Sequence, residues 1–383
     1  MDAANSIGCH IPMWKLFQSI SYTDPPPEFV IVQDGWKEDE HDSILKKKDL
    51  ISSFELANEW ELRKKITNPY EAIFSTSDTN SFPSIAHVNP LSRSYFKMVE
   101  MLYVAEFWNT ATTPLTTAHV CEGPGGFLQC IVEQAKERRM NIANAYAMTL
   151  KSTKSQIPGW KRSSKFLKKH PEIQLLYGPD MTGNILLKRN QDAFCETAKD
   201  AAIFTADGGF DFSMDYSKQE ETAFSLVVAS FSMALRTVRK GGIFIIKLFD
   251  IYSPVTVDLI LGSAAFCTSF YIYKPATSRP CNSERYFIGL GYKGRREARE
   301  WIEHLEIAQR KHIEKPLTRL CDIPATSPYI LAVKEQIAWQ ERLQTSSIEA
   351  AMFMKKEDIA GHVERAIKKS VEWCSTFGVP YGL

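Results

Sequence analysis

The chain has 383 residues, of which 44% are hydrophobic and 24% charged, with 22 Phe, 14 Tyr and 8 Trp. This length exceeds the usual size of a single hydrophobic core, so we expect one large domain with additions or two domains, and the apolar content excludes a largely disordered chain. The formal net charge of +1 neither indicates nor excludes a nucleic-acid-binding protein, because binding needs a local basic surface rather than a global excess.

Signals for membrane insertion, secretion and metal binding are absent from the sequence. No run of eighteen uncharged apolar residues occurs, and the first thirty residues lack a basic start followed by an apolar block. We therefore expect a soluble, non-secreted protein. The eight cysteines form no C-x-x-C pair and the eight histidines form no H-x-x-x-H spacing. This pattern favours buried free thiols over disulfides and predicts no metal site.

Residues 1–88 are predicted to form an N-terminal extension that packs beside a core domain. They contain Pro25-Pro26-Pro27, a mixed-charge stretch from Glu38 to Lys48 and a helix-like stretch from Leu50 to Lys65. Clusters of basic residues along the whole chain are candidates for contacting a polyanion, although each alone is more typical of a solvated helix face. These clusters are Lys46 to Lys48, Arg63 to Lys65, Lys161 to Lys169 and Lys293 to Arg299.

From residue 92 onward the pattern changes to alternating helices and strands. The apolar spacing of Phe96, Val99 and Leu102 predicts a helix. Short apolar runs bounded by turn residues then alternate with helical segments, which is typical of parallel β-α-β construction. The runs are 118–121, 142–149, 172–177, 201–206 and 243–249. Residues 219–240 have helical spacing, and Gly241-Gly242 is predicted to close that helix as a C-terminal cap.

The last two predicted strands, Ser269 to Lys274 and Arg285 to Tyr292, are separated by only about ten residues, too few for a crossover helix. We therefore expect them to pair antiparallel. The predicted fold is α/β and Rossmann-like, of the class I methyltransferase type, with a mostly parallel sheet whose last strand is antiparallel. Residues 89–294 would form this domain, and the charged, helix-like residues 295–383 a C-terminal helical extension.

The segment C-E-G-P-G-G-F, which ends at Phe127, directly follows the first parallel strand and opens a helix. Glycines let a backbone approach a ligand and a helix N-terminus adds N–H donors, so this turn can hold a nucleotide or the carboxylate of a methionine moiety. A tight strand-to-helix turn without a ligand is the alternative. The segment is not G-x-G-x-x-G, and the next strand ends at Lys151 without an acidic residue for an NAD ribose. Both departures argue against a dehydrogenase.

Two charged residues stand at or near the ends of later strands. Asp207 follows an apolar strand and precedes Gly208-Gly209. Ligands of open α/β sheets bind outside such strand ends, although Asp-Gly turns without a function are common. Lys247 lies inside the apolar strand 243–249 and must either snorkel or be paired, because an unpaired buried ammonium is costly. Asp207, at the end of the preceding strand, is its natural partner.

The segment Lys274 to Tyr286, K-P-A-T-S-R-P-C-N-S-E-R-Y, joins the last two strands. It combines prolines, cations, hydroxyls, an amide and a carboxylate, which predicts a polar recognition loop; a solvated hairpin loop is the alternative. Its prolines limit backbone freedom, so less ordering entropy is lost on binding a ligand.

Together these motifs resemble the FtsJ-like ribose 2′-O-methyltransferases, and within them the eukaryotic mRNA cap-1 methyltransferases, over residues 92–294. The most specific piece is S-R-P-x-N-S-E-R-Y; the others are Arg93-x-x-x-Lys97, Glu122 to Phe127, Met148 to Lys151, Asp207 to Phe210 and Lys247-x-Phe249-Asp250. The resemblance implies S-adenosylmethionine as cofactor and capped mRNA as substrate. It further implies a capping enzyme or RNA polymerase as candidate partners, no membrane, and a nuclear location, or a cytoplasmic one for a viral protein.

The resemblance also implies roles for individual residues. The family's catalytic Lys, Asp, Lys and Glu fall on Lys97, Asp207, Lys247 and Glu284. The implied cofactor contacts are Glu122, Gly123, Pro124, Gly125, Gly126, Phe127 and Asp180, and those to cap and substrate are Arg93, Ser217, Lys218, Gln219 and Asn282. Lys274 and Arg279 are expected to meet the triphosphate bridge of the cap.

The expected reaction is an in-line displacement that needs positioning and a base but no metal. Lys247 is predicted to take the proton of a ribose hydroxyl, with the charge of Lys97 lowering its pKa. Asp207 and Glu284 would orient the two ammonium groups and oppose part of that depression.

Three functions are compatible with these residues. The leading one is a cap-1 2′-O-methyltransferase that acts on the first transcribed nucleotide. The second keeps the chemistry but acts on the second cap nucleotide, ribosomal RNA or tRNA, and the cap-type loop argues against the last two. The third is an inactive RNA-binding scaffold subunit, against which the intact tetrad argues, because a scaffold has no physical need for two opposed lysines in one site.

Overall fold

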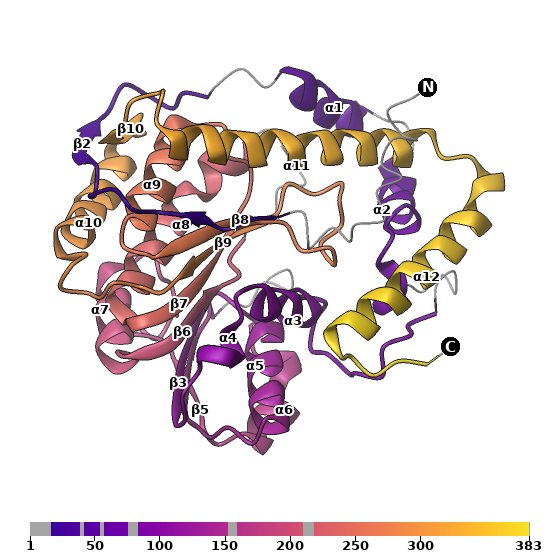
Figure 1. Ribbon diagram of the computed structural model, residues 1–383, viewed down its shortest axis with the longest axis horizontal. Coiled ribbons are helices and arrows are strands. Elements are labelled where there is room, and N and C mark those ends of the chain that lie inside the picture. The colour runs from indigo at the N-terminus through magenta and orange to yellow at the C-terminus, as the bar shows by residue number, and fades with distance from the viewer. Residues whose placement is uncertain are drawn as a thin grey trace.

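The computed structural model describes residues 17–38, 42–53, 57–75, 83–151, 159–209 and 218–382. At the centre of this part lies a mixed sheet with the strand order β1-β8-β9-β7-β6-β3-β4-β5 (Figure 1). In chain order its strands are β1 (Ile20–Ser21), β3 (Leu115–Val120), β4 (Ile142–Met148), β5 (Ile173–Leu176), β6 (Ala201–Ala206), β7 (Val238–Leu248), β8 (Ser269–Tyr273) and β9 (Arg285–Leu290).

The pairing confirms the predicted mixture of parallel and antiparallel strands. Strand β3 pairs parallel with β4 and β6, β4 with β5, and β6 with β7, whereas β9 pairs antiparallel with both β7 and β8. The chain leaves β3 toward β4 and β5 and then returns to the other side of β3 as β6. The carboxyl ends of β3 and β6 therefore face the crevice at which open α/β sheets bind ligands.

Helices cover both faces of the sheet, which explains why most residues of its central strands β3, β6, β7 and β9 are buried. On β7, Ile243 and Ile245 belong to one hydrophobic core, and Phe244 and Ile246 belong to the other, because successive side chains point to opposite faces. The first core includes α3 (Ser94–Val104) and α5 (Gly126–Glu137), with the short α4 (Phe107–Thr110) beside them. The second includes α7 (Lys188–Thr197), α8 (Gln219–Thr237) and α9 (Pro254–Ala264).

The N-terminal extension contains helices, as expected, and strands as well. Its elements are β1, β2 (Glu28–Val32), α1 (Asp42–Ser53), α2 (Ala57–Ile66) and the 3₁₀ turn η2 (Glu71–Ile73). Strand β1 adds an antiparallel edge to β8, and β2 pairs with β10 (Arg319–Asp322). A buried ion pair of 2.6 Å between Lys48 on α1 and Asp250 after β7 also fixes this extension to the sheet.

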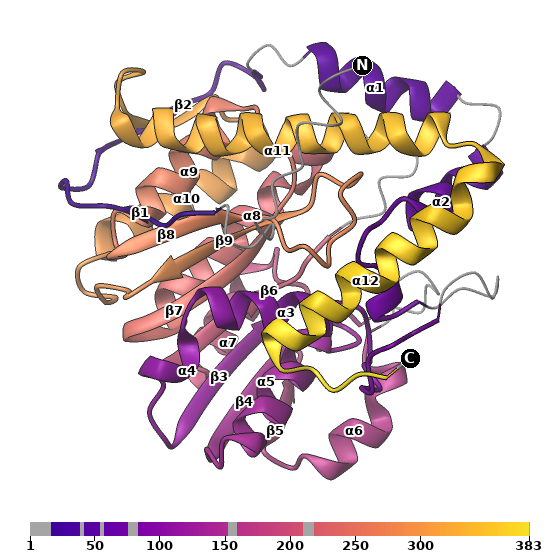
Figure 2. The same ribbon diagram turned by 45° about the vertical axis from the view of Figure 1, so that its right-hand side comes forward.

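The C-terminal extension is predominantly helical and packs on the N-terminal one. Its helices are α10 (Arg299–Glu314), α11 (Pro328–Phe353) and α12 (Ile359–Phe377), with the short η4 (Lys356–Asp358) between the last two. Helix α11 runs beside α1, and α12 descends along α2 (Figures 1 and 2). A small cluster formed by Ile51, Trp60, Ile348, Ala351 and Met352 joins α11 to the N-terminal helices.

One predicted boundary is wrong. Helix α8 ends at Thr237, and Gly241-Gly242 lies within β7 instead of capping the helix. The reason is strand pairing: Val238 is already in register with Ala201 of β6, and the register shifts before the next pair. The glycines therefore occupy an irregular stretch of β7, where Gly241 has a φ of +78°.

Two further properties of the described residues bear on the expectations above. None of the helices in these ranges is both long enough and apolar enough to span a membrane. The seven cysteines in the same ranges are free thiols.

Candidate active site

The four charged residues singled out in the sequence meet at the carboxyl ends of the central strands. Asp207 follows β6, Lys247 is the penultimate residue of β7, Glu284 directly precedes β9, and Lys97 projects from α3. Their side chains are only 12–14% exposed. The site is thus largely desolvated, yet solvent still reaches it.

Glu284 lies between the two lysines. Its Oε1 is 2.6 Å from Lys97 Nζ and its Oε2 is 3.7 Å from Lys247 Nζ. Asp207 Oδ1 holds Lys247 from the other side at 3.1 Å. The pairing expected between Lys247 and Asp207 is therefore confirmed. Positive and negative groups alternate in the order Lys97, Glu284, Lys247 and Asp207.

Tyr286 is a member of this cluster that sequence reasoning did not single out. It is fully buried, and its hydroxyl donates to Asp207 Oδ1 at 2.9 Å and lies 3.3 Å from Glu284 Oε1. Burial and the two carboxylates raise its pKa well above the ordinary value, so it stays a donor. Its position could have identified it: Tyr286 is two residues after Glu284, and residues two apart in an extended segment point to the same side.

The charges of the cluster fix the protonation of Lys247 in the free protein. Burial alone would lower its pKa, but Asp207 and Glu284 outweigh burial and raise the pKa above the usual lysine value. The expected depression by Lys97 is therefore wrong for the free protein, because the ammonium of Lys97 is itself paired with Glu284. Burial would likewise raise the pKa of Glu284, yet the surrounding lysines hold it well below its usual range.

The glycine-rich turn after β3 is shaped mainly by contacts within the chain. A Cβ on Gly123 would lie 2.6 Å from the carbonyl oxygen of Gly159, and one on Gly126 would overlap the hydroxyls of Ser92 and Ser94. Gly125, with a φ of +104°, is the N-cap residue that directly precedes helix α5. Packing thus explains two of the three glycines without any ligand.

Two neighbours of these glycines have contacts of their own. Phe127 is fully buried and packs toward Tyr286, with 5.8 Å between ring centroids, so its predicted cofactor contact stays a prediction for its backbone alone. The carbonyl of Pro124 accepts a hydrogen bond from the hydroxyl of Ser163, in the 3₁₀ turn η3 (Lys161–Ser163). Trp160, just before η3, lies over Gly125, because a Cβ there would be 3.0 Å from its ring.

Glu122 presents a buried carboxylate oxygen at the end of β3. Glu122 is only 4% exposed, and its Oε1 accepts a hydrogen bond from the hydroxyl of Thr205. Its Oε2 accepts no hydrogen bond from any described residue and lies 3.5 Å from His119 Nδ1. A buried oxygen without a donor is costly in a folded chain, so this atom is suited to a ligand that brings a donor or a cation.

Asp180 lies in the turn after β5 and uses its carboxylate there. Its Oδ1 accepts from the backbone N–H and hydroxyl of Thr182 and from Asn190, and its Oδ2 contacts the exposed Arg189. The turn itself lies beside the end of β4, since Lys151 N–H donates to Thr182 at 2.7 Å. These hydrogen bonds lower the pKa of Asp180.

Residues 274–284, which we call the recognition loop, close on a buried lysine. Lys274 is 1% exposed, and its Nζ donates to the carbonyls of Asn282 and Glu284, at 2.7 Å each, and to Ser278 Oγ at 3.3 Å. Burial lowers its pKa to about 7. The expected contact of Lys274 with a triphosphate is wrong, because the loop itself surrounds its Nζ.

The other predicted substrate residues are distributed around this loop. Gln219 at the start of α8 accepts a hydrogen bond from Ser283 at 2.5 Å, and Lys218 beside it is exposed. Ser217 lies outside the described residues. Asn282 is half-buried and uses its backbone N–H and carbonyl within the loop. Its side-chain amide makes no hydrogen bond with the described residues.

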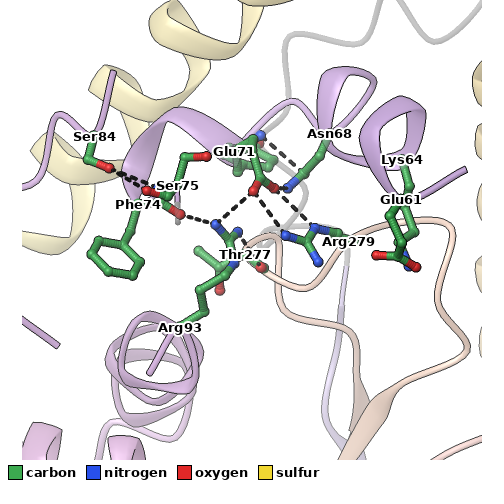
Figure 3. Close-up of polar contacts among 11 residues, drawn as sticks. Glu61, Lys64, Asn68, Glu71, Phe74, Ser75, Ser84, Arg93, Thr277 and Arg279 are labelled. Carbon is green, nitrogen blue, oxygen red and sulfur yellow. Dashed lines mark hydrogen bonds and ion pairs between the residues drawn. The ribbon is translucent and has the colours of Figure 1, made fainter. Parts of the chain in front are cut away.

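Arg93 and Arg279 converge on one carboxylate from the N-terminal extension. Figure 3 shows Glu71 between the two guanidinium groups. Arg279 Nη2 is 3.0 Å and Arg93 Nη1 is 3.3 Å from Glu71 Oε1, and Arg93 also donates to the carbonyl of Phe74. Both arginines are 18–19% exposed, so part of each group reaches the surface near the site.

Two of the basic clusters noted in the sequence are partly used inside the protein. Lys48 is buried against Asp250, and Arg63 donates to carbonyls near the end of α11. In the third cluster, at η3 and α6 (Ser164–Lys169), the cations are exposed: Lys161, Arg162, Lys165, Lys168 and Lys169.

Comparison with known proteins agrees with this geometry. Residues 90–292 match the family model described as FtsJ-like methyltransferase. A relative from Trypanosoma brucei brucei, named cap-specific mRNA (nucleoside-2'-O-)-methyltransferase 1, is 28% identical over 243 residues, which cover 62% of this chain and 63% of the relative.

Mammalian relatives of the same name are much longer than this chain. The mouse protein is 31% identical over 294 residues, which cover 69% of this chain and 32% of the relative. The human protein is 31% identical over 268 residues, which cover 63% of this chain and 30% of the relative. The chain thus spans less than two thirds of the trypanosome relative and about a third of the mammalian ones.

Proposed function

The chain belongs to the FtsJ-like methyltransferase family, and we propose that it methylates the ribose 2′-hydroxyl of the first transcribed nucleotide of capped mRNA. The observation that carries this proposal is the cluster of Lys97, Glu284, Lys247 and Asp207, with contacts of 2.6–3.7 Å, at the crevice of the sheet. The names of the relatives support the cap as the substrate. A scaffold subunit would have no use for a desolvated cluster of alternating charges, because such clusters are costly to bury.

S-adenosylmethionine is the proposed cofactor, and it would supply a methyl group activated by a sulfonium. The Oε2 of Glu122, which accepts no hydrogen bond from the described residues, is proposed to bind the cationic amino group of a methionine moiety. The N-terminus of α5, which begins beyond Gly125, fits its carboxylate. Gly123 to Gly126 would line this site through their backbone, and Asp180 stays a proposed contact at the end of β5.

Lys247 is the proposed general base. The ribose hydroxyl would lie beside its Nζ and lose its proton to the neutral amine as its oxygen bonds to the methyl carbon. The bond from that carbon to sulfur would break in the same step and release a neutral thioether, and Lys247 would then pass the proton to water. Asp207 Oδ1 fixes the position of Nζ from 3.1 Å, and the hydroxyl of Tyr286 in turn holds Asp207 Oδ1 at 2.9 Å. Lys97 and Glu284 would hold the ribose and its neighbouring phosphate in line.

The recognition loop is proposed to make the enzyme specific for the cap. It is held before any ligand arrives, by Lys274 from inside, by Gln219 through Ser283, and by Glu71 through Arg279. A preformed loop loses little entropy on binding. The side-chain amide of Asn282 can both donate to and accept from the cap. Arg279 presents part of a guanidinium to the bridging phosphates.

A nuclear location and recruitment by a capping enzyme or RNA polymerase complete the proposal, because cap methylation acts on nascent transcripts. A cytoplasmic location would fit a viral protein.

Nuclease mapping tests the position of the methyl group. The full chain is incubated with radiolabelled cofactor and capped RNA, and the labelled RNA is digested to nucleotides and separated. We expect the label on the first transcribed nucleotide. Label on the second nucleotide would move the reaction one position along the cap, and internal label would favour a general RNA methyltransferase. Absence of label would favour the scaffold.

A further inference from the structure

A buried carboxylate from the N-terminal extension joins the helix and the loop that carry two of the site residues. Glu71 is fully buried in η2, and the guanidinium groups around it come from different elements (Figure 3). Arg93 immediately precedes α3, and Arg279 lies in the recognition loop. Glu71 therefore connects α3 with the recognition loop across a large distance in sequence.

The contacts of Glu71 saturate both of its oxygens. Oε1 lies 3.0 Å from Arg279 Nη2 and 3.3 Å from Arg93 Nη1. Oε2 receives Arg279 Nε at 3.2 Å and Asn68 Nδ2 at 2.7 Å. Burial alone would raise the pKa of Glu71, but the two arginines outweigh burial and lower it, so the carboxylate remains charged.

The carboxylate is what allows the two cations to stand side by side. Burial lowers the pKa of Arg93 to about 10, and the charge of Arg279 contributes in the same direction, whereas Glu71 opposes both effects. Without that negative charge the two guanidinium groups would repel each other across a partly desolvated gap. The recognition loop would then keep its other contacts with this region, among them the Thr277 carbonyl with Arg93 and the Ala276 N–H with Glu100 of α3, and would shift relative to the start of α3.

The contacts of Arg93 and Arg279 with Glu71 connect the same two segments as one ion pair inside the active site. Arg93 lies one helical turn before Lys97, and Arg279 lies in the same loop as Glu284. The ion pair of 2.6 Å between Lys97 and Glu284 thus spans the same gap as the Arg93, Glu71 and Arg279 bridge. A shift of the loop at one bridge must change the other.

We propose that Glu71 is a positioning residue for methyl transfer, which holds the recognition loop at the distance from α3 that places Glu284 between the two lysines. The inference rests on the proposed function. Glu71 acts through Glu284 and touches neither cofactor nor ribose. The N-terminal extension is therefore part of the active site's support, although it lies outside the segment that matches the family model.

Steady-state kinetics of Glu71→Gln on capped RNA tests this role. Misplacement of a catalytic group by about 1 Å costs on the order of 100-fold, so we expect kcat to fall by roughly 10- to 100-fold. The Kd for S-adenosylmethionine should stay within about twofold, because Glu122 and its turn lie on other elements, and unchanged cofactor binding would also show that the variant is folded. Asn68→Ala, which removes one hydrogen bond to Glu71, should lower kcat in the same direction by a smaller factor.

Asp258→Asn is the matched control. Asp258 is also a buried carboxylate that binds an arginine through both oxygens, at 2.8 and 3.2 Å, but it joins α9 to β10 away from the site. Its loss should lower the melting temperature without lowering kcat at a temperature where the variant is folded. An equal fall in kcat for both variants at matched stability would show that Glu71 has only a general structural role.

A double variant separates positioning from simple destabilisation. If Glu71 acts through Glu284, then Glu71→Gln should have no further effect on kcat in a Glu284→Gln background. Multiplicative losses would overturn the proposal, as would a Glu71→Gln protein whose kcat stays within twofold of wild type.

Hydrogen exchange tests the same restraint without any substrate. We expect the backbone amides of residues 276–284 to exchange faster in Glu71→Gln than in wild type, with no change in the turn after β3. Unchanged exchange in the loop would contradict the positioning role. A wild-type protein that methylates no capped RNA would contradict the proposed function instead, and this measurement would still decide the role of Glu71.

Discussion

Glu284 Oε1 lies 2.6 Å from Lys97 Nζ, although one residue belongs to a helix before the first parallel strand and the other to the loop before the last strand of the sheet. The same carboxylate reaches toward Lys247 with its second oxygen, at 3.7 Å. Glu284 thus keeps two ammonium groups in one small, largely desolvated space.

Replacing Lys247 with Ala should nearly abolish methyl transfer, because loss of a positioned base costs roughly 100- to 10,000-fold. The Kd for S-adenosylmethionine, measured by calorimetry, should not change. Lys199→Ala, which removes an exposed lysine paired with Glu196, serves as the control and should keep wild-type turnover. Turnover of Lys247→Ala near that of the control would show that another group takes the proton.

The rate of methyl transfer should keep rising with pH up to and above 10.5, the ordinary pKa of a lysine. Asp207 and Glu284 outweigh burial and raise the pKa of Lys247 above 10.5, so only a small fraction is neutral at pH 7 and that fraction grows about tenfold per pH unit. Single-turnover rates at pH 7 to 10 measure this dependence without product release. A rate that is already constant between pH 7 and 9 would contradict the assignment of Lys247 as the base.

Gly125→Val should weaken cofactor binding. The residue has a φ of +104° and its Cβ would meet Trp160 at 3.0 Å, so a branched side chain must distort the turn beside the proposed cofactor site. The matched control is Gly378→Val at the end of α12, where φ is +66° but no atom lies within 4 Å of the Cβ. Calorimetry should show weaker binding only for Gly125→Val. Undiminished affinity in a folded Gly125→Val protein would place the cofactor elsewhere.

Lys274→Met should change how stability depends on pH. Burial lowers the pKa of Lys274 to about 7 in the folded protein, whereas the unfolded chain keeps the ordinary value of 10.5. Between these values the unfolded state binds more protons, so this lysine makes wild-type stability rise with pH. Denaturant unfolding at pH 7 to 10 should show a shallower rise for Lys274→Met. Parallel curves for the two proteins would contradict the buried, neutral amine.

Asn282→Ala should impair methylation of capped RNA while it spares cofactor affinity. Its backbone N–H and carbonyl already bond within the loop, so the substitution removes only the side-chain amide proposed to bind the cap. Loss of a hydrogen bond to a buried ligand group costs about 1–3 kcal/mol, or roughly 5- to 150-fold in kcat/KM. Unchanged kcat/KM on capped RNA would remove Asn282 from the cap site.

The sequence predicted the sheet well, because its strands are continuous apolar runs and the spacing before the last strand allows only a hairpin. It failed at Gly241-Gly242, since the pairing of Val238 with Ala201 is a long-range contact that local turn preferences do not reveal. The edge strand β1 was also beyond reach, because two residues, Ile20 and Ser21, carry no periodic pattern.

For the site, residue types at strand ends were sufficient to bring Asp207 and Lys247 together. Local sequence could not show that Lys274 is enclosed by its own loop or that Phe127 faces the core, because both depend on packing between distant elements. Nor could it weigh the charges around Lys247: the sign of its pKa shift is set by two carboxylates whose distances only the fold determines.

Methyl transfer to matched capped and triphosphate-ended RNAs of identical sequence tests the central claim most directly. The wild-type protein should label the capped RNA and leave the triphosphate-ended RNA near background, and Lys247→Ala should label neither. Equal labelling of the two RNAs by the wild-type protein would contradict cap-dependent methylation.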